Sequence, residues 1–206
     1  MLDIDVHHGN GAQRGFYSQR DVLTVSLHMD HGSRGDACLE SGTVEECGHG
    51  PGVGFNINIP LPMASGDEVY RQAMARIAVP EIAAYQPDVL IVGAGLDGSQ
   101  VDPNGRMLLT MKGFHDIGAG IATLAAQMES TKLLVVQEGG YAETYTAYCA
   151  HALLEGILGT GRLLEDPFGK GLYPSESPEE AEELVMAIKA ARRQAMVQQL
   201  ALAHAA

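Results

Sequence analysis

The sequence is poor in cysteine and has no long hydrophobic run. Its three cysteines, Cys38, Cys47 and Cys149, form no CxxC pair, which argues against a disulfide framework or a cysteine-based zinc site and indicates reduced thiols. No apolar run approaches the roughly 18 residues that span a bilayer, and residues 1–5 lack the basic and apolar segments of a signal peptide. We therefore expect a cytoplasmic protein without a membrane segment.

Basic residues are also scarce. Thirteen Lys and Arg stand against 26 Asp and Glu among 206 residues, which gives a formal net charge of −13. Because phosphate binding needs clustered Lys and Arg, this balance argues against direct nucleic-acid binding. Hydrophobic residues make up 46% and charged residues 19%, which is a globular composition, and the length favours one domain.

Short apolar runs alternate with longer segments of helical period. Strands are predicted at residues 2–6, 22–27, 55–59, 89–92 and 133–136, and helices at residues 67–85, 111–128 and 143–158. Pro80 predicts a kink in the first helix, and Thr110 is the predicted N-cap of the second. Near-continuous apolar strands separated by helices indicate an α/β domain with a mainly parallel sheet, covered on both faces.

The last 41 residues differ from the rest, so we divide the chain into a main domain, 1–165, and a tail, 166–206. The tail opens with a linker rich in Gly, Pro and Ser at residues 167–178. Ser177 and Pro178 then predict the start of an amphipathic helix that extends to about Ala203. Its apolar stripe predicts packing on the main domain or on a partner subunit, which leaves a homo-oligomer open.

The most informative stretch is DIDVHHGNG, residues 3–11. On a strand, alternate residues share a face, so Asp3, Asp5 and His7 emerge together at the carboxyl end of a predicted strand, where open parallel sheets bind ligands. Two carboxylates and an imidazole are costly to bury without a cation. The alternative is an acidic strand end that hydrogen-bonds to neighbouring loops.

Two further strand ends carry polar groups. Asp97 follows the predicted strand 89–92, and Tyr141 follows two glycines after the strand 133–136. Alone, Asp97 would be interpreted as a helix N-cap and Tyr141 as a core or rim residue. Together with Asp5 and His7, Asp97 makes the three-ligand set with an open position that is typical of catalytic zinc. Zinc-bound water attacks carbonyl carbons and a tyrosine hydroxyl stabilises the resulting oxyanion, so the set predicts amide hydrolysis.

These motifs resemble the histone deacetylase superfamily, in particular bacterial class II histone-deacetylase-like amidohydrolases, which are related to acetylpolyamine amidohydrolases. The resemblance extends to about Gly161, and its segments are DIDVHHGNG (3–11), DVLTVSLH (21–28), GVGFNINIPLP (52–62), GLDG (95–98) with the following DP (102–103) and GRM (105–107), and EGGY (138–141). The resemblance implies the three-layer α/β/α sandwich of the arginase/deacetylase fold. Residues 1–165 would then be part of a catalytic domain whose N-terminal portion is missing.

The resemblance also implies roles for individual residues. Asp5, His7 and Asp97 match the zinc ligands, and Tyr141 matches the tyrosine that polarises the substrate carbonyl. Family members bind potassium as well. A first potassium site matches Asp3, Ser26 and Leu27 with the main chain of Asp5 and His7, and a second matches the backbone of Phe16, Val22 and Phe55. The expected substrate is an acetylated amine, either acetyl-lysine or an acetylated polyamine, chosen by the glycine-rich loop at residues 31–54.

The sequence departs from the family in one respect. The family's general-base pair of adjacent histidines precedes the DIDVHHGNG-type strand, and the 206 residues contain no such upstream pair; His7 is a ligand and His8 would support the loop. The prediction is a zinc-dependent deacetylase, and the alternative is a non-catalytic fragment or pseudoenzyme that keeps metal binding. A third reading, a binuclear manganese ureohydrolase, would need further ligands that His8, Asn10 and Gly98 do not offer.

Overall fold

The computed structural model describes residues 1–31, 42–128, 130–169 and 171–205. Its centre is one sheet of five parallel strands in the order β3-β2-β1-β4-β5. The strands are β1 (Leu2–Asp3), β2 (Thr24–Met29), β3 (Asn56–Leu61), β4 (Val89–Ala94) and β5 (Lys132–Gln137). Each lies within two residues of its predicted range except β1, so the predicted α/β class and parallel sheet are confirmed.

The first strand is shorter than predicted because its own aspartates compete for the backbone. Asp5 N–H donates to Asp3 Oδ1 and His7 N–H donates to Asp5 Oδ1, at 3.0 and 2.8 Å. Such local side-chain bonds bend the chain away from regular pairing. Ile4 and Val6 nevertheless stay buried in the core, so residues 4–7 still continue along the sheet.

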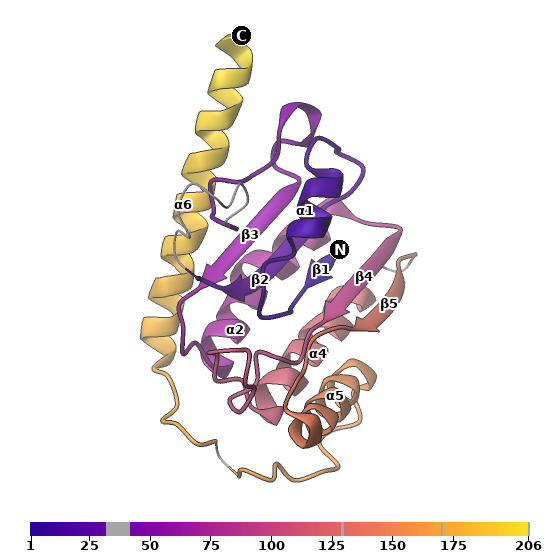
Figure 1. Cartoon of the computed structure of the whole chain (residues 1–206). Coiled ribbons are helices and arrows are strands. Elements are labelled where there is room, and N and C mark those ends of the chain that lie inside the picture. Colours follow the sequence, from indigo (N-terminus) through magenta and orange to yellow (C-terminus); the bar gives the residue numbers. More distant parts are fainter. Residues whose placement is uncertain (32–41, 129, 170, 206) are drawn as a thin grey trace.

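Helices lie on both faces of the sheet. In Figure 1, α1 (Asn10–Phe16) lies in front of β2, whereas α2 (Asp67–Ala73) and α4 (Met111–Ala126) lie behind the sheet. The sequence did not predict α1, since Gly11 and Gly15 lower its helix propensity and Gln13 is its only buried residue. A short 3-10 turn, η1 (Gly50–Gly52), precedes β3.

The predicted helix 67–85 forms as three consecutive segments. α2 continues into a π-helical segment, η2 (Met74–Ala78), and then into α3 (Val79–Tyr85). Pro80 therefore lies in the first turn of α3, two residues after the π segment ends, where a residue without an N–H and with a bulky ring disturbs the regular bonding of the preceding turn. The Thr110 cap is confirmed, because its hydroxyl accepts from Lys112 N and Gly113 N at 3.1 and 3.5 Å.

Two helices complete the chain. α5 (Glu143–Leu158) packs on α4, and α6 (Pro178–Ala205) packs on α2. Ala181 and Val185 of α6 are buried there. The division of the chain at residue 165 into a main domain and a tail stays a prediction. No helix in the described ranges is both apolar enough and long enough to cross a membrane.

Candidate metal centre

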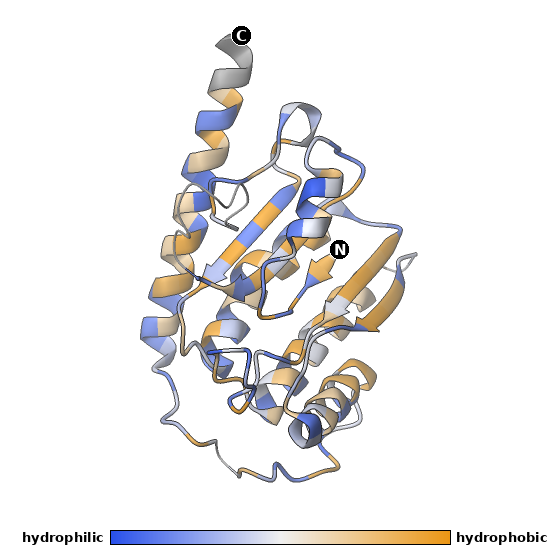
Figure 2. Cartoon of the chain, in the orientation of Figure 1, coloured by the Kyte–Doolittle hydropathy of each residue, from blue (hydrophilic) through white to orange (hydrophobic). Residues whose placement is uncertain are grey.

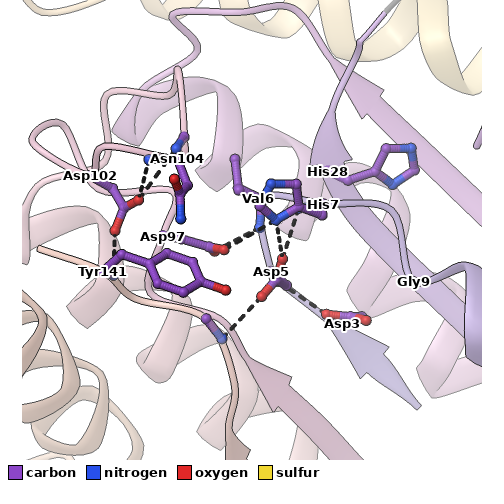
Figure 3. Close-up of polar contacts among 12 residues, drawn as sticks. Asp3, Asp5, Val6, His7, Gly9, His28, Asp97, Asp102, Asn104 and Tyr141 are labelled. Atoms are coloured by element: carbon purple, nitrogen blue, oxygen red, sulfur yellow. Dashed lines mark hydrogen bonds and ion pairs between the residues drawn. The ribbon is translucent and has the colours of Figure 1, made fainter. Parts of the chain in front are cut away.

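Asp5, His7 and Asp97 converge on one point at the carboxyl end of the sheet. Each offers one ligand atom, and these atoms lie within 4.8 Å of one another. His7 Nδ1 is 3.1 Å from Asp5 Oδ1 and 3.3 Å from Asp97 Oδ2. Figure 3 shows Asp5 and His7 on the segment after β1 and Asp97 facing them from the loop after β4. The three predicted ligands are therefore brought together although 90 residues separate His7 from Asp97 along the chain.

Backbone donors hold both carboxylates but leave one oxygen without a donor. Asp5 Oδ2 accepts from Gly139 N at 3.1 Å, and Asp97 Oδ1 accepts from Val6 N at 2.9 Å. Asp97 is fully buried, and its Oδ2 accepts no hydrogen bond among the described residues. A buried carboxylate oxygen in this state is unfavourable unless a cation pairs with it. The donor set, two carboxylates and an imidazole, is one that zinc accepts.

A glycine allows the strand ends to approach this closely. A Cβ at Gly139 would overlap Oδ2 of both Asp97 and Asp5. Any side chain at this position would therefore separate the two carboxylates or move the β5 end away from them. The EGGY motif thus contributes to the ligand geometry as well as supplying the tyrosine.

The electrostatics of the centre are those of a site short of positive charge. Burial, and then the neighbouring charge of Asp5, raises the pKa of Asp97 to about 6. Burial also raises the pKa of Asp3 to about 6, with repulsion from Asp5, Glu138 and Asp97 adding to the effect. A bound cation would relieve this crowding of carboxylates.

Tyr141 faces the ligands from the end of β5. Figure 3 shows its ring extending toward Asp5 and Asp97. The charge of Asp97 raises the pKa of the Tyr141 hydroxyl above its usual value, so the phenol stays protonated and can donate a hydrogen bond. Its side chain is half exposed and can therefore meet a ligand that arrives from solvent.

Asp102 fixes the main chain of Tyr141, a role that the sequence analysis missed. Its Oδ2 accepts from the N–H groups of Tyr141 and Ala142 at 2.7 and 3.2 Å, and its Oδ1 accepts from Asn104 N at 2.9 Å. Asp102 is buried and belongs to the loop that follows Asp97. Its place in a DPNG turn was the available signal, because Asp in such turns binds backbone N–H groups.

The residues of the first predicted potassium site are also neighbours. Asp3 and Ser26 are register partners on β1 and β2, and Ser26 Oγ accepts from Gly9 N at 3.3 Å. Leu27 is buried beside them. At the second predicted site, the carbonyls of Phe16 and Phe55 already accept from Gln19 N and Thr24 N, at 2.9 and 3.0 Å. Both potassium sites stay predictions.

Between α1 and β3 lies a buried network of side-chain amides that the sequence analysis also missed. Gln13 Oε1 accepts from the side-chain amides of Asn56 and Asn58, each at 2.8 Å, and lies 3.0 Å from His8 Nε2. This places His8 in the supporting role predicted for it. The polar residues at alternate positions of the apolar strand β3 were the signal for the network. His31 adds a ring stacked on His7 with centroids 5.9 Å apart. Residues 32–41 of the predicted substrate loop, 31–54, lie outside the described residues.

A second metal cluster is not found in the part of the chain that the structure describes. The set Asp5, His7 and Asp97 is the one group there of three or more His, Cys, Asp or Glu side chains with this geometry. The described residues therefore give no support to a binuclear manganese centre.

Comparison with known proteins agrees with the resemblance in the sequence. The family model "Histone deacetylase domain" matches residues 1–157. Histone deacetylase 8 of Arabidopsis thaliana is 46% identical over 177 residues, which is 85% of this chain and 46% of that protein. The histone deacetylase-like amidohydrolase of Pseudomonas aeruginosa is 38% identical over 169 residues, or 81% of this chain and 43% of that protein.

A solved structure extends this likeness to the fold. The crystal structure of acetylpolyamine aminohydrolase from Burkholderia pseudomallei matches with a TM-score of 0.68 and 34% identity, over 76% of this chain and 43% of that one. The predicted arginase/deacetylase fold is therefore confirmed for the part of that fold which this chain covers. The chain spans about half the length of these relatives.

Proposed function

Because the chain belongs to the histone deacetylase family, we propose that it carries the metal-binding part of a zinc-dependent amidohydrolase that removes the acetyl group from an amine. The substrate would be acetyl-lysine or an acetylated polyamine. The protein would act in the cytoplasm. The observation that carries the proposal is the convergence of Asp5, His7 and Asp97 around a buried oxygen that accepts no hydrogen bond. Relatives named as deacetylases and amidohydrolases support the same reaction class.

In this proposal Asp5, His7 and Asp97 would hold zinc, which would supply a water of lowered pKa and polarise the substrate carbonyl. Tyr141 donates a hydrogen bond from its protonated hydroxyl to the carbonyl oxygen and to the oxyanion that develops there. Asp102 positions Tyr141 through its main chain. Asp3, Ser26 and Leu27 would hold potassium and so offset the repulsion among the carboxylates.

Proton transfer needs groups that these residues do not supply. His7 faces the ligand cluster, and His8 and His28 take part in buried contacts with Gln13 and Ser26. Burial lowers the pKa of His28 to about 4, so that imidazole is neutral at physiological pH and is a poor proton donor there. We infer that the general-base histidines of the active enzyme lie outside this 206-residue sequence. The second candidate, a zinc-binding but non-catalytic fragment, is favoured by the same observation.

Two measurements test the proposal. Zinc titration of the purified chain, followed by calorimetry and elemental analysis, should give one zinc per chain. A folded chain that binds no stoichiometric zinc would overturn the metal assignment. An acetyl-lysine peptide and an acetylated polyamine should then be hydrolysed only when the remainder of a deacetylase domain is supplied; hydrolysis by the chain alone would show that it contains its own proton-transfer groups.

A further inference from the structure

Helix α6 presents apolar or small side chains on two opposite sides. Its inner side packs on α2, where Ala181 and Val185 are buried. On the opposite side, Met186 and Val197 are 44% and 58% exposed, and Ala190 between them is also exposed. At about 3.6 residues per turn these three positions fall on one stripe, roughly half a turn away from the buried pair. We define the outer stripe of α6 as Met186, Ala190, Arg193 and Val197.

The outer stripe is unusual for a side of a helix that faces solvent. A surface helix normally carries charged and polar residues opposite its buried side, whereas a helix that is apolar all round is buried all round. Figure 2 shows hydrophobic segments recurring along α6, also where the helix extends beyond β3. The members of the outer stripe are spaced by four, three and four residues, which is the spacing of the seam between two paired helices. The outer stripe therefore has the pattern of a second helix-packing surface.

Charge is separated along α6. Its first two turns contain four glutamates, at residues 179, 180, 182 and 183, whereas residues 184–205 contain three Lys and Arg residues and no acidic one. The seam spacing extends back to Glu183, seven residues before Ala190. Glu183 and Arg193 are both exposed, and neither forms a salt bridge with the described residues. The two ends of one seam thus carry opposite charges that are not used within the chain.

We propose that the outer stripe of α6 binds the outer stripe of a second copy of this chain, with the two helices antiparallel. Two-fold pairing in this register places Met186 of each copy over Ala190 of the other, so a large side chain packs beside a small one. It also places Arg193 of each copy beside Glu183 of the other. Because every contact occurs twice, the pair closes as a dimer.

The charges decide between the possible arrangements. A parallel pair would set Arg193 against Arg193 and Glu183 against Glu183, and like charges at such positions repel. In the antiparallel pair, the basic part of each helix lies along the glutamates of the other. The attraction is therefore local to the interface, although each chain has a net charge of −13. Dimerisation of this kind is independent of the proposed function.

The oligomeric state of the full 206-residue chain gives the first test. Sedimentation velocity over a range of protein concentrations should show a reversible dimer, with twice the mass of one chain, and should give its Kd. A chain that stays monomeric at every concentration would overturn the proposal. Trimers or larger assemblies as the main species would overturn it as well, because a two-fold contact closes with two copies.

A matched pair of lysine variants locates the interface. Ala190→Lys puts a charge where Met186 of the other copy packs, and it should weaken the dimer by at least about tenfold. Ala191→Lys changes the neighbouring exposed residue, about 100° further round the helix, and should leave the Kd unchanged. Lysine favours helix, so both variants should keep the circular dichroism spectrum of the wild type. Equal effects of the two variants would overturn the assigned surface.

A charge exchange tests the direction of pairing. Arg193→Glu sets two acidic groups against each other twice in the dimer and should weaken it about tenfold. Combining it with Glu183→Arg restores opposite charges across the interface and should return the Kd to that of the wild type. Arg162→Glu, an exposed position outside α6, changes the net charge equally and is the control. A double variant that stays as weak as Arg193→Glu would overturn the antiparallel arrangement.

Discussion

The two halves of the sheet differ in how they are buried. Every residue of β2 is buried, and on β3 only Pro60 is more than slightly accessible. By contrast, β4 exposes Val89 and Ile91, and no residue of β5 is fully buried. On the β2–β3 side, α1 and the amide network around Gln13 cover the front of the sheet. The β4–β5 side has no such cover among the described residues. The candidate metal centre lies where these halves meet, because Asp5 and His7 follow β1 while Asp97 and Tyr141 follow β4 and β5.

The largest expected effect comes from breaking this junction. Asp97→Ala removes the buried ligand of the β4 side, and His7→Ala removes a ligand of the β1 side. Each should abolish stoichiometric zinc binding, and with it activity in the reconstituted enzyme, because three protein ligands become two. Elemental analysis after dialysis measures the loss. Full zinc retention by Asp97→Ala would contradict the ligand set; Asp116→Ala, on α4, is the control.

On the β5 side, Tyr141 is the residue with a proposed chemical role. Tyr141→Phe should leave zinc bound and lower the rate of the reconstituted enzyme by about 10²–10³, the range found on loss of one oxyanion donor. Steady-state kinetics on an acetyl-lysine peptide give the effect, with Tyr173→Phe in the linker as a control. An unchanged rate would show that another group stabilises the oxyanion.

Paired truncations compare the two halves directly. Ile59→Ala on β3 empties a fully buried position and should cost about 2–5 kcal/mol in the free energy of unfolding. Leu134→Ala on β5 should cost under about 1 kcal/mol in the isolated chain, because its side chain is already half exposed. Urea denaturation measures both values. Equal costs would mean that the β5 face is covered in solution.

The last effect depends on pH and concerns the metal-free chain alone. Folding raises the pKa of Asp97 from 3.8 to about 6, so the folded metal-free chain holds this proton more tightly than the unfolded chain. The resulting stabilisation is lost as the pH rises from 3.8 to about 6, and above that pH the charged group carries its full cost. Asp97→Asn keeps the acceptor for Val6 N and removes the charge. It should therefore stabilise the metal-free chain by about 1–3 kcal/mol at pH 7 and by much less at pH 4.

Thermal unfolding in the presence of a chelator measures the difference between this variant and the wild type. Comparing the variant with the wild type cancels the effect of His28, which changes stability with pH in the opposite sense. Folding lowers the pKa of His28 from 6.5 to about 4, so the stability that comes from its neutral form is lost as the pH falls through that range. A variant less stable than the wild type at pH 7 would contradict the raised pKa of Asp97.

The sequence predicted most of the fold because its strong signals are local. The runs at β3, β4 and β5 are mostly apolar and β-branched, and Thr110 and Ser177 cap their helices as expected. Helix α1 escaped prediction because it has little apolar periodicity and is held by tertiary bonds of Gln13. The strand β1 is shortened because the side chains of Asp3 and Asp5 accept hydrogen bonds from nearby N–H groups. The hydrophobic pattern of the sequence does not reveal such bonds.

The site was predictable to the extent that strand ends of one parallel sheet must share an edge. This rule placed Asp5, His7, Asp97 and Tyr141 together before any coordinates. It could not identify Asp102 or Gly139, because their roles depend on distances between loops. Long-range hydrogen bonds such as Asp102 to Tyr141 N, 39 residues apart, leave no periodic trace in a sequence.

The Asp102 carboxylate has a mechanical consequence. Its two oxygens join the loop that carries Asp97 to the turn that carries Tyr141, so the proposed metal ligand and the proposed hydrogen-bond donor are tied to each other through the backbone. Flexing of β5 against β4 would shift both together and preserve their separation. The spacing that the proposed reaction needs would therefore be kept in part by this one side chain, together with the bond from Leu96 N to Gly139 O.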